Sequence, residues 1–376
     1  MIAQYKKALL SIKDELDHLT LHKDDFDSLY KYQLHLIGYI KKLEFRIRKQ
    51  KQNNRNSESA QVALSIFKSF GDAIAFNYID THNLKQLSFN LDDEEFKNKS
   101  GFISDKEGFD FELEVLKTLI YDKKIPALLC DITNSIRYGD ILMLFATDPI
   151  LLECKSGSSK GSRNSRQKSS LIKLSEFYKN DKKDLFHGTQ YAIRASIASQ
   201  PIRYTDKLNE LIKDAQNSGS SSEMIEAGLH YLIIKDPSKF EYEVSKIKLK
   251  NPLVFYLNMF KENQQWISYI PYVLSIYDKN DLIDFIIGKL NIIVFIDLAE
   301  IKRIAARLNL RYEARFGSVH PFEFYLFETN KEKASGMFGI SWHYIHRVPL
   351  EMYSLKWLIS NSLDLYKNQD LTIAST

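Results

Sequence analysis

Residues 139–157 (GDILMLFATDPILLECKSG) constrain the fold more than any other part of the sequence. Two short apolar runs flank an Asp-Pro pair, which is typical of a β-hairpin. Side chains alternate between the two faces of a strand, so Glu153 and Lys155 should share one face of the second strand. The first strand begins at Asp140. The pattern therefore predicts two carboxylates and one amine at the same end of a sheet.

These charges need compensation, because partial burial beside apolar residues disfavours ionised groups. A divalent cation would compensate Asp140 and Glu153. Oxygen ligands suit Mg²⁺ or Mn²⁺, and the backbone carbonyl of Cys154 is a further candidate ligand. Such a site favours phosphodiester hydrolysis, in which the metal offsets the charge that develops at phosphorus. Lys155 would then orient or deprotonate the attacking water.

The preceding segment GFDFELEVLKTLI predicts a helix over residues 109–120. Glu112 shares a helix face with the apolar residues three, four and seven positions later, so it should point inward. Glu114 lies on the opposite face and should be solvated.

Together these elements resemble the PD-(D/E)XK nuclease superfamily, whose fold is also called restriction-endonuclease-like. Gly139-Asp140 and Glu153-Cys154-Lys155 match the two strand elements of that family, and Glu112 matches the glutamate of its first helix. The resemblance covers about residues 107–236. It implies an α/β fold, with a mixed sheet flanked by helices.

The same resemblance implies a Mg²⁺-dependent nuclease, in restriction, repair or bacterial defence. DNA is the preferred substrate, and RNA is the alternative. The residues implied as catalytic are Asp140, Glu153, Lys155 and Glu112, and the implied metal ligands are Asp140, Glu153 and Glu112. The alternative is a catalytically silent nuclease-like subunit that binds DNA or acts as a scaffold. The presence of all three residues of the Asp140, Glu153 and Lys155 set argues against that alternative.

A basic segment follows the hairpin. Between Lys155 and Lys183 the sequence has nine Lys or Arg and two acidic residues, a balance typical of phosphate contacts. The alternative interpretation is that this segment is a solvated loop followed by a solvated helix face. Within and just before a helix expected over 166–180, the candidate nucleic-acid contacts are Lys160, Arg163, Arg166, Gln167, Lys168 and Lys173.

The length of 376 residues favours two or three domains. Residues 1–100 are expected to form a helical module, 101–236 the nuclease core, and 237–376 an α+β region that either folds separately or extends the core. The helical module is either a bundle that packs on the core, or a surface that clasps DNA, a partner protein or a second copy of the chain.

Periodicity also predicts individual elements. Helices are expected over 26–50, 62–77 and 297–310, and strands over 125–131, 139–146, 150–155, 228–236, 240–250 and 291–297. The segments NSGSSSE (217–223) and GMFGISW (336–342) are expected to be loops.

Composition sets outer limits. The net charge of +4 permits a polyanionic partner without requiring one. The two cysteines lie in apolar runs, which excludes a disulfide framework or a zinc cluster. The sequence shows neither a secretory signal nor an apolar stretch long enough for a membrane helix, so a cytoplasmic protein without a membrane partner is expected.

Overall fold

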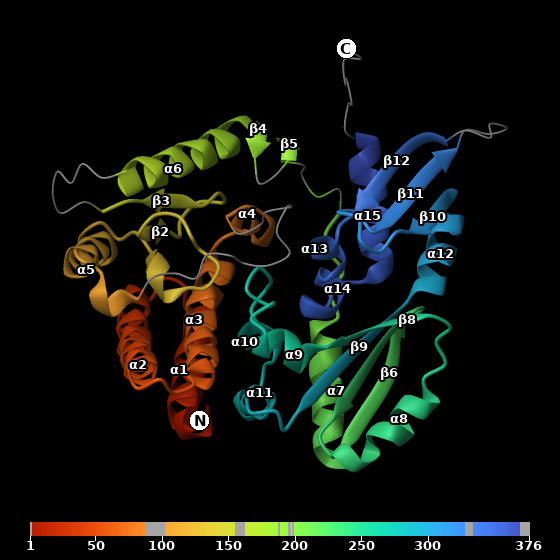
Figure 1. The fold of residues 1–376 in the computed structure, drawn as a ribbon, viewed down its shortest axis with the longest axis horizontal. Helices are drawn as coiled ribbons and strands as arrows, with labels where there is room; N and C mark the ends of the chain where they lie inside the picture. Colours follow the sequence, from red (N-terminus) through yellow and green to blue (C-terminus); the bar gives the residue numbers. More distant parts are fainter. Residues whose placement is uncertain are drawn as a thin grey trace. The chain divides into compact units, whose positions relative to one another are not determined.

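The computed structural model describes residues 2–87, 102–154, 162–186, 189–194, 197, 199–327 and 334–368. The chain forms a mixed α/β structure with several small sheets (Figure 1). It divides into two compact units, one made of residues 1–192 and 261–287, the other of 193–260 and 288–376. In the described part of the chain, no helix is both long and apolar enough to cross a bilayer.

The first unit begins with a helical bundle. A 3₁₀ turn (Ile2–Tyr5) leads into α1 (Lys6–Leu21), α2 (Phe26–Gln52), α3 (Glu58–Tyr78) and α4 (Thr81–Lys85). The apolar positions of α1 are buried as their spacing predicts: Leu9, Ile12, Leu16 and Leu19. Asp25 caps α2 by accepting a hydrogen bond from the amide of Ser28.

The segment that resembles a nuclease core follows in the same unit. Its elements are the 3₁₀ turn η2 (Ile103–Asp105), α5 (Phe109–Lys117), the π-helical turn η3 (Thr118–Asp122), β1 (Ala127–Leu129), the 3₁₀ turn η4 (Cys130–Ile132), β2 (Ile141–Met143), β3 (Ile150–Leu152), α6 (Ser162–Asn180), β4 (Lys182–Phe186) and β5 (Thr189–Ile193). The helices α10 (Tyr272–Ser275) and α11 (Lys279–Ile286) complete the unit. In Figure 1 the strands β2 and β3 lie between α1–α3 and α6.

Strands β1, β2 and β3 form an antiparallel sheet in which Leu129 pairs with Ile141 and Ile141 with Leu152. The sheet confirms the predicted hairpin. The mixed sheet implied by the family resemblance is not what β1–β3 form, because their short connections can join only antiparallel neighbours. Strand β4 pairs with β5 and does not extend this sheet.

The second unit contains two antiparallel sheets. One has the order β6-β7-β9-β8 and the other β10-β11-β12. Its elements are α7 (Thr205–Ser218), β6 (Ser220–Glu226), β7 (Leu229–Ile234), a 3₁₀ turn (Pro237–Lys239), α8 (Phe240–Lys246), β8 (Pro252–Tyr256), β9 (Asn291–Asp297), α12 (Leu298–Arg307), β10 (Leu310–Ala314), β11 (Phe322–Phe327), β12 (Ala334–Ile340), α13 (Trp342–Ile345), α14 (Arg347–Leu350) and α15 (Leu355–Asn368). Helix α9 (Leu257–Glu262) spans the division between the units.

The observed division differs from the predicted boundaries at 100 and 236. Helices α1–α4 belong to the same unit as the β1–β3 sheet. Residues 193–236 belong to the second unit, because β7 pairs along its length with β9, more than fifty residues later. Such a non-local pairing leaves no periodic signal in the sequence.

Three predictions of local structure are wrong. Residues 240–246 form α8 instead of a strand, because Asp236 accepts a hydrogen bond from Ser238 and Pro237 starts a helical turn. Ser220–Glu226 and Ala334–Ile340 form strands instead of loops, because β7 and β11 supply their hydrogen-bond partners. Tertiary pairing overrides weak strand propensity in both.

Buried polar side chains of the bundle hold the segments that follow it. Gln33 accepts from the amide of Leu129 at 3.0 Å and donates to the carbonyl of Ala127 at 2.9 Å, so it pairs with β1 as a neighbouring strand would. Asp72 accepts from the amides of Asn134 and Ser135, each at 2.9 Å. These bonds satisfy backbone groups that would otherwise be buried without partners.

Helix α3 also touches the 3₁₀ turn η4 directly. A Cβ added to Gly71 would lie 2.2 Å from the carbonyl oxygen of Ile132, far inside van der Waals contact. Gly38, in the middle of α2, has nothing within 4 Å of the corresponding position.

These two glycines make a matched pair. We expect Gly71→Ala to destabilise the protein by about 1–3 kcal/mol, because the added methyl overpacks the α3–η4 contact. We expect Gly38→Ala to stabilise it by about 0.5–1 kcal/mol, because alanine favours the helix and meets no neighbour. Denaturant unfolding measures both changes. Equal effects of the two substitutions would contradict the close approach.

Candidate metal centre

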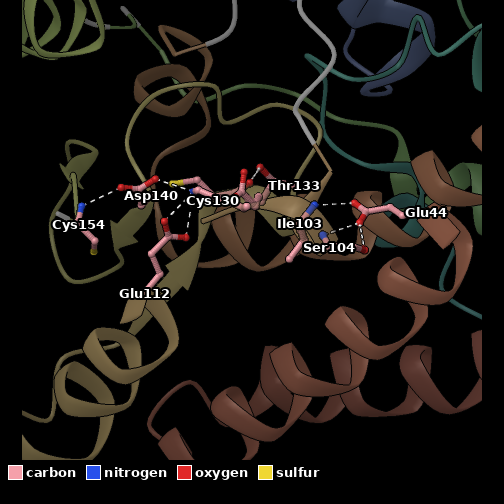
Figure 2. A network of polar contacts seen from close by, with 10 residues as sticks. Glu44, Ile103, Ser104, Glu112, Cys130, Thr133, Asp140 and Cys154 are labelled. Carbon is pink, nitrogen blue, oxygen red and sulfur yellow. Dashed lines mark hydrogen bonds and ion pairs between the residues drawn. The ribbon is translucent and has the colours of Figure 1, made fainter. Parts of the chain in front are cut away.

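Four charged side chains meet where η2, α5, η4 and the start of β2 come together. Lys106 follows η2, Glu112 lies on α5, Asp131 lies in η4 and Asp140 directly precedes β2. Figure 2 shows Glu112 and Asp140 pointing toward the same place. Since each side chain comes from a different element, only the folded chain can assemble them.

The ammonium of Lys106 is the centre of this group. Its Nζ lies 2.7 Å from an oxygen of Asp131, 2.7 Å from one of Asp140, and 2.9 Å from both oxygens of Glu112. The Lys106 and Asp131 side chains are partly exposed, whereas Glu112 is buried. Three carboxylates around one ammonium leave excess negative charge, so the group is suited to attract further cations.

The electrostatics follow from burial and from the shared cation. Burial raises the pKa of Glu112 to about 7, although the Lys106 ammonium acts in the opposite direction. Burial also acts to lower the pKa of Lys106, but Asp131, Asp140 and Glu112 outweigh it and raise that pKa above its usual value. Lys106 is therefore charged, and Glu112 exchanges its proton near neutral pH.

Asp140 is held by two different groups. One oxygen accepts from Lys106, and the other accepts from the backbone amide of Cys154 at 2.8 Å. The Glu153-Cys154 peptide therefore lies against the Asp140 carboxylate. The sequence pointed to the carbonyl of Cys154 as a ligand, whereas the observed contact is made by its amide. Burial, assisted by Asp140, raises the pKa of the Cys154 thiol to about 11.

A local irregularity positions Asp140. Its amide donates to the carbonyl of Leu152 at 2.8 Å, while the next residue, Ile141, also pairs with Leu152. The ladder is therefore irregular where β2 begins, and this irregularity sets the direction of the Asp140 side chain. Gly139 makes the turn into β2 with φ +69°, and a Cβ there would lie 2.9 Å from the Leu152 oxygen. Only glycine fits at this position.

The structure brings together some of the predicted site residues. Glu112 is buried and Glu114 exposed, as the helical spacing predicted. Glu112 and Asp140 are brought together by their shared contact with Lys106. Glu153 lies just beyond the end of β3 and is half-buried. Lys155 lies outside the described residues.

The predicted basic contacts remain predictions. Lys160 lies outside the described residues. The backbone of α6 contains Arg163, Arg166, Gln167 and Lys168, whose side chains are not among those described. Lys173, on the same helix, is exposed.

Sequence reasoning missed Lys106 and Asp131. Lys106 lies in a polar segment that looks like a connection, and nothing in its neighbours indicates a site. Asp131 had a usable signal, because it directly follows the apolar run of residues 127–130. The antiparallel pairing of Leu129 with Ile141 then brings the end of that run near Asp140.

The donor set fits a hard cation in chemistry but is spaced for an ammonium. Carboxylate oxygens are the ligands that Mg²⁺ and Mn²⁺ prefer, and Mg²⁺ binds them at about 2.0–2.1 Å. Contacts of 2.7–2.9 Å to Lys106 would have to shorten by roughly 0.7 Å for Mg²⁺. Among the described residues, no three His, Cys, Asp or Glu side chains lie close enough together to hold a metal as they stand.

Comparison with known proteins adds no further constraint. No protein-family model, curated protein or solved structure matches the chain. Function must therefore be argued from the geometry of the site.

The raised pKa of Glu112 predicts a pH-dependent stability. The pKa is about 7 in the folded protein against 4.5 for a free carboxyl, so this stabilisation is complete below 4.5 and is lost as pH rises through about 7. We expect wild type to lose on the order of 2–3 kcal/mol more than Glu112→Gln between about pH 5 and about pH 8. Unfolding in EDTA measures this difference.

The exposed Glu114 provides the control on the same helix. Glu114→Gln should follow the pH dependence of wild type. If Glu112→Gln also follows it, Glu112 does not titrate near neutral pH in the folded protein.

Proposed function

We propose that this protein is a metal-dependent phosphodiesterase of the restriction-endonuclease-like type, acting on DNA. The observation that carries the proposal is the convergence of Glu112, Asp131 and Asp140 on the Lys106 ammonium at the end of a β-hairpin. The element order α5-β1-β2-β3-α6 and the place of Asp140 at the start of β2 agree with the resemblance noted in the sequence. A role in restriction or defence is part of this proposal.

Each of these residues would have a separate role. Asp140 and Glu112, with Glu153 from the adjacent strand end, would hold Mg²⁺ or Mn²⁺. When bound, the metal supplies a Lewis acid that activates water and offsets charge at phosphorus. Lys155 would orient the attacking water. Asp131, which the sequence did not suggest, contacts the Lys106 ammonium together with Asp140. It would therefore belong to the same set of metal ligands.

The second candidate is a nuclease-like subunit without turnover. Lys106 favours it, because an ammonium bonded to three carboxylates is a built-in substitute for a metal ion. The two candidates differ in one respect: a working enzyme must let a divalent cation displace Lys106, whereas a silent subunit keeps Lys106 in place.

Activity tests the first candidate directly. We expect the purified chain to cleave plasmid, linear or single-stranded DNA with Mg²⁺ or Mn²⁺ and not with EDTA. Asp140→Asn and Glu153→Gln should each lower the rate about a hundredfold or more, because each removes a charged ligand. Glu114→Gln should cleave like wild type. Equal rates for the wild type and all three variants on every substrate, RNA included, would refute the catalytic hypothesis.

Metal binding tests the role of Lys106. Without metal, Lys106→Met should melt at a lower temperature than wild type, because three carboxylates lose their counter-ion. Mn²⁺ should then raise its melting temperature more than it raises that of wild type. Lys106→Arg, which keeps a cation, should resemble wild type. Calorimetric titration with Mn²⁺ measures the affinities, and identical affinities for all three proteins would show that Lys106 does not compete with the metal.

A further inference from the structure

The end of helix α2 carries a concentrated positive charge. Residues 41–55 contain seven Lys or Arg and a single acidic residue, Glu44. Glu44 is buried, and its carboxylate accepts bonds from the amides of Ile103 and Ser104 at 3.0 Å. The acid therefore faces the interior. Lys42, Lys49, Lys51 and Arg55 are exposed.

Three of these charges form a stripe with an aromatic ring beside it. Lys42, Arg46 and Lys49 follow at intervals of four and three residues, so they lie on one face of the helix. Phe45 lies between them and is 66% exposed. A single-strand-binding surface combines basic side chains with an exposed ring of this kind, on which a base stacks.

This face is continuous with the elements that carry Glu112, Asp131 and Asp140. The Lys41 ammonium lies 4.6 Å from the centroid of the Phe109 ring, at the start of α5, and the Arg48 guanidinium lies 5.3 Å from that of Phe102. Ser104, bonded to Glu44, precedes Lys106 by two residues, which span at most about 7 Å. Figure 2 shows Glu44, Ser104 and Asp140 in the same view.

We propose that this face of α2 binds a single-stranded nucleic acid, with phosphates on the basic side chains and an unpaired base stacked on Phe45. The residues that form the surface are Lys42, Phe45, Arg46 and Lys49. The surface deepens the proposed function, on which it rests for the choice of nucleic acid as the polyanion. From Lys42 to Lys49 the helix extends roughly 10 Å, so more than one phosphate of a strand is within reach.

Binding is measured in EDTA, so that cleavage does not interfere. The full chain is titrated against a fluorescently labelled single-stranded oligonucleotide and against the same sequence as a duplex, from about 50 to about 200 mM salt. The charge variant is K42Q/R46Q/K49Q, which preserves helix propensity. The control is K6Q/K7Q/K123Q, which removes the same charge from exposed lysines outside this face.

The charge variant should bind more weakly and reduce the slope of log affinity against log salt by about 2, since each lost contact to a single strand accounts for about 0.7. The control should keep the slope of wild type. Equal slopes for wild type and the charge variant, or equal losses in the variant and the control, would overturn the proposal.

The ring is tested separately. Phe45→Ala should weaken single-strand binding about tenfold and duplex binding much less, whereas Phe45→Trp should retain affinity and change its fluorescence on binding. All variants change side chains at the protein surface, so their melting temperatures should match that of wild type. Equal binding by Phe45→Ala and wild type would contradict the stacking role.

Two results separate this inference from the proposed function. Binding that depends on the α2 face, without cleavage in the presence of any metal, would refute the enzyme and support the binding surface. Cleavage by the wild type, with wild-type binding by both the charge variant and the ring variant, would support the enzyme and refute the binding surface. Loss of anionic-lipid vesicle binding in these variants, with no oligonucleotide binding by wild type, would replace the nucleic acid by a membrane and so overturn the proposal.

Discussion

The site depends on three buried polar side chains of the helical bundle. Gln33 completes the hydrogen bonding of β1, Glu44 holds the turn before Lys106, and Asp72 binds the amides that follow η4. The strands of this sheet are only three residues long, so they supply few bonds of their own. Leaving such buried groups unpaired costs about 1–3 kcal/mol each. The bundle is thus the frame on which residues 102–154 are built, although the sequence suggested a separate module.

That frame makes an unfavourable collection of charges tolerable. Glu112, Asp131 and Asp140 repel one another, and burial acts against ionisation of Glu112. One ammonium offsets part of this cost, and the amide of Cys154 offsets another part. A protein retains such an arrangement where cation binding or proton exchange is useful, which is why perturbed acids cluster at functional sites. The cluster is therefore the best guide to function, and the α2 face beside it supplies the opposite charge that a phosphate backbone requires.

Two of the four charged residues in the cluster, Glu112 and Asp140, could be placed from the sequence. Glu112 could be placed inward because the helix period relates it to apolar residues on its own helix. Asp140 and the hairpin could be found because an apolar pattern and a turn pair lie close together in sequence. The fold then brought Asp140 against the Glu153-Cys154 peptide, at an irregular start of β2 that the sequence did not predict. Local pattern and local geometry agree in this segment, so inference from sequence succeeds.

The sequence by itself determined the helices of the N-terminal region, the hairpin and the inward direction of Glu112, because each depends on residues within a few turns or one strand pair. Only the tertiary structure decided that Lys106 is the counter-ion, since it meets Asp131 and Asp140 across 25 and 34 residues of chain. It also decided the division into units and the strand state of residues 220–226, which require partners from distant segments. Periodicity records which face of an element is buried and carries no information about which other element covers it.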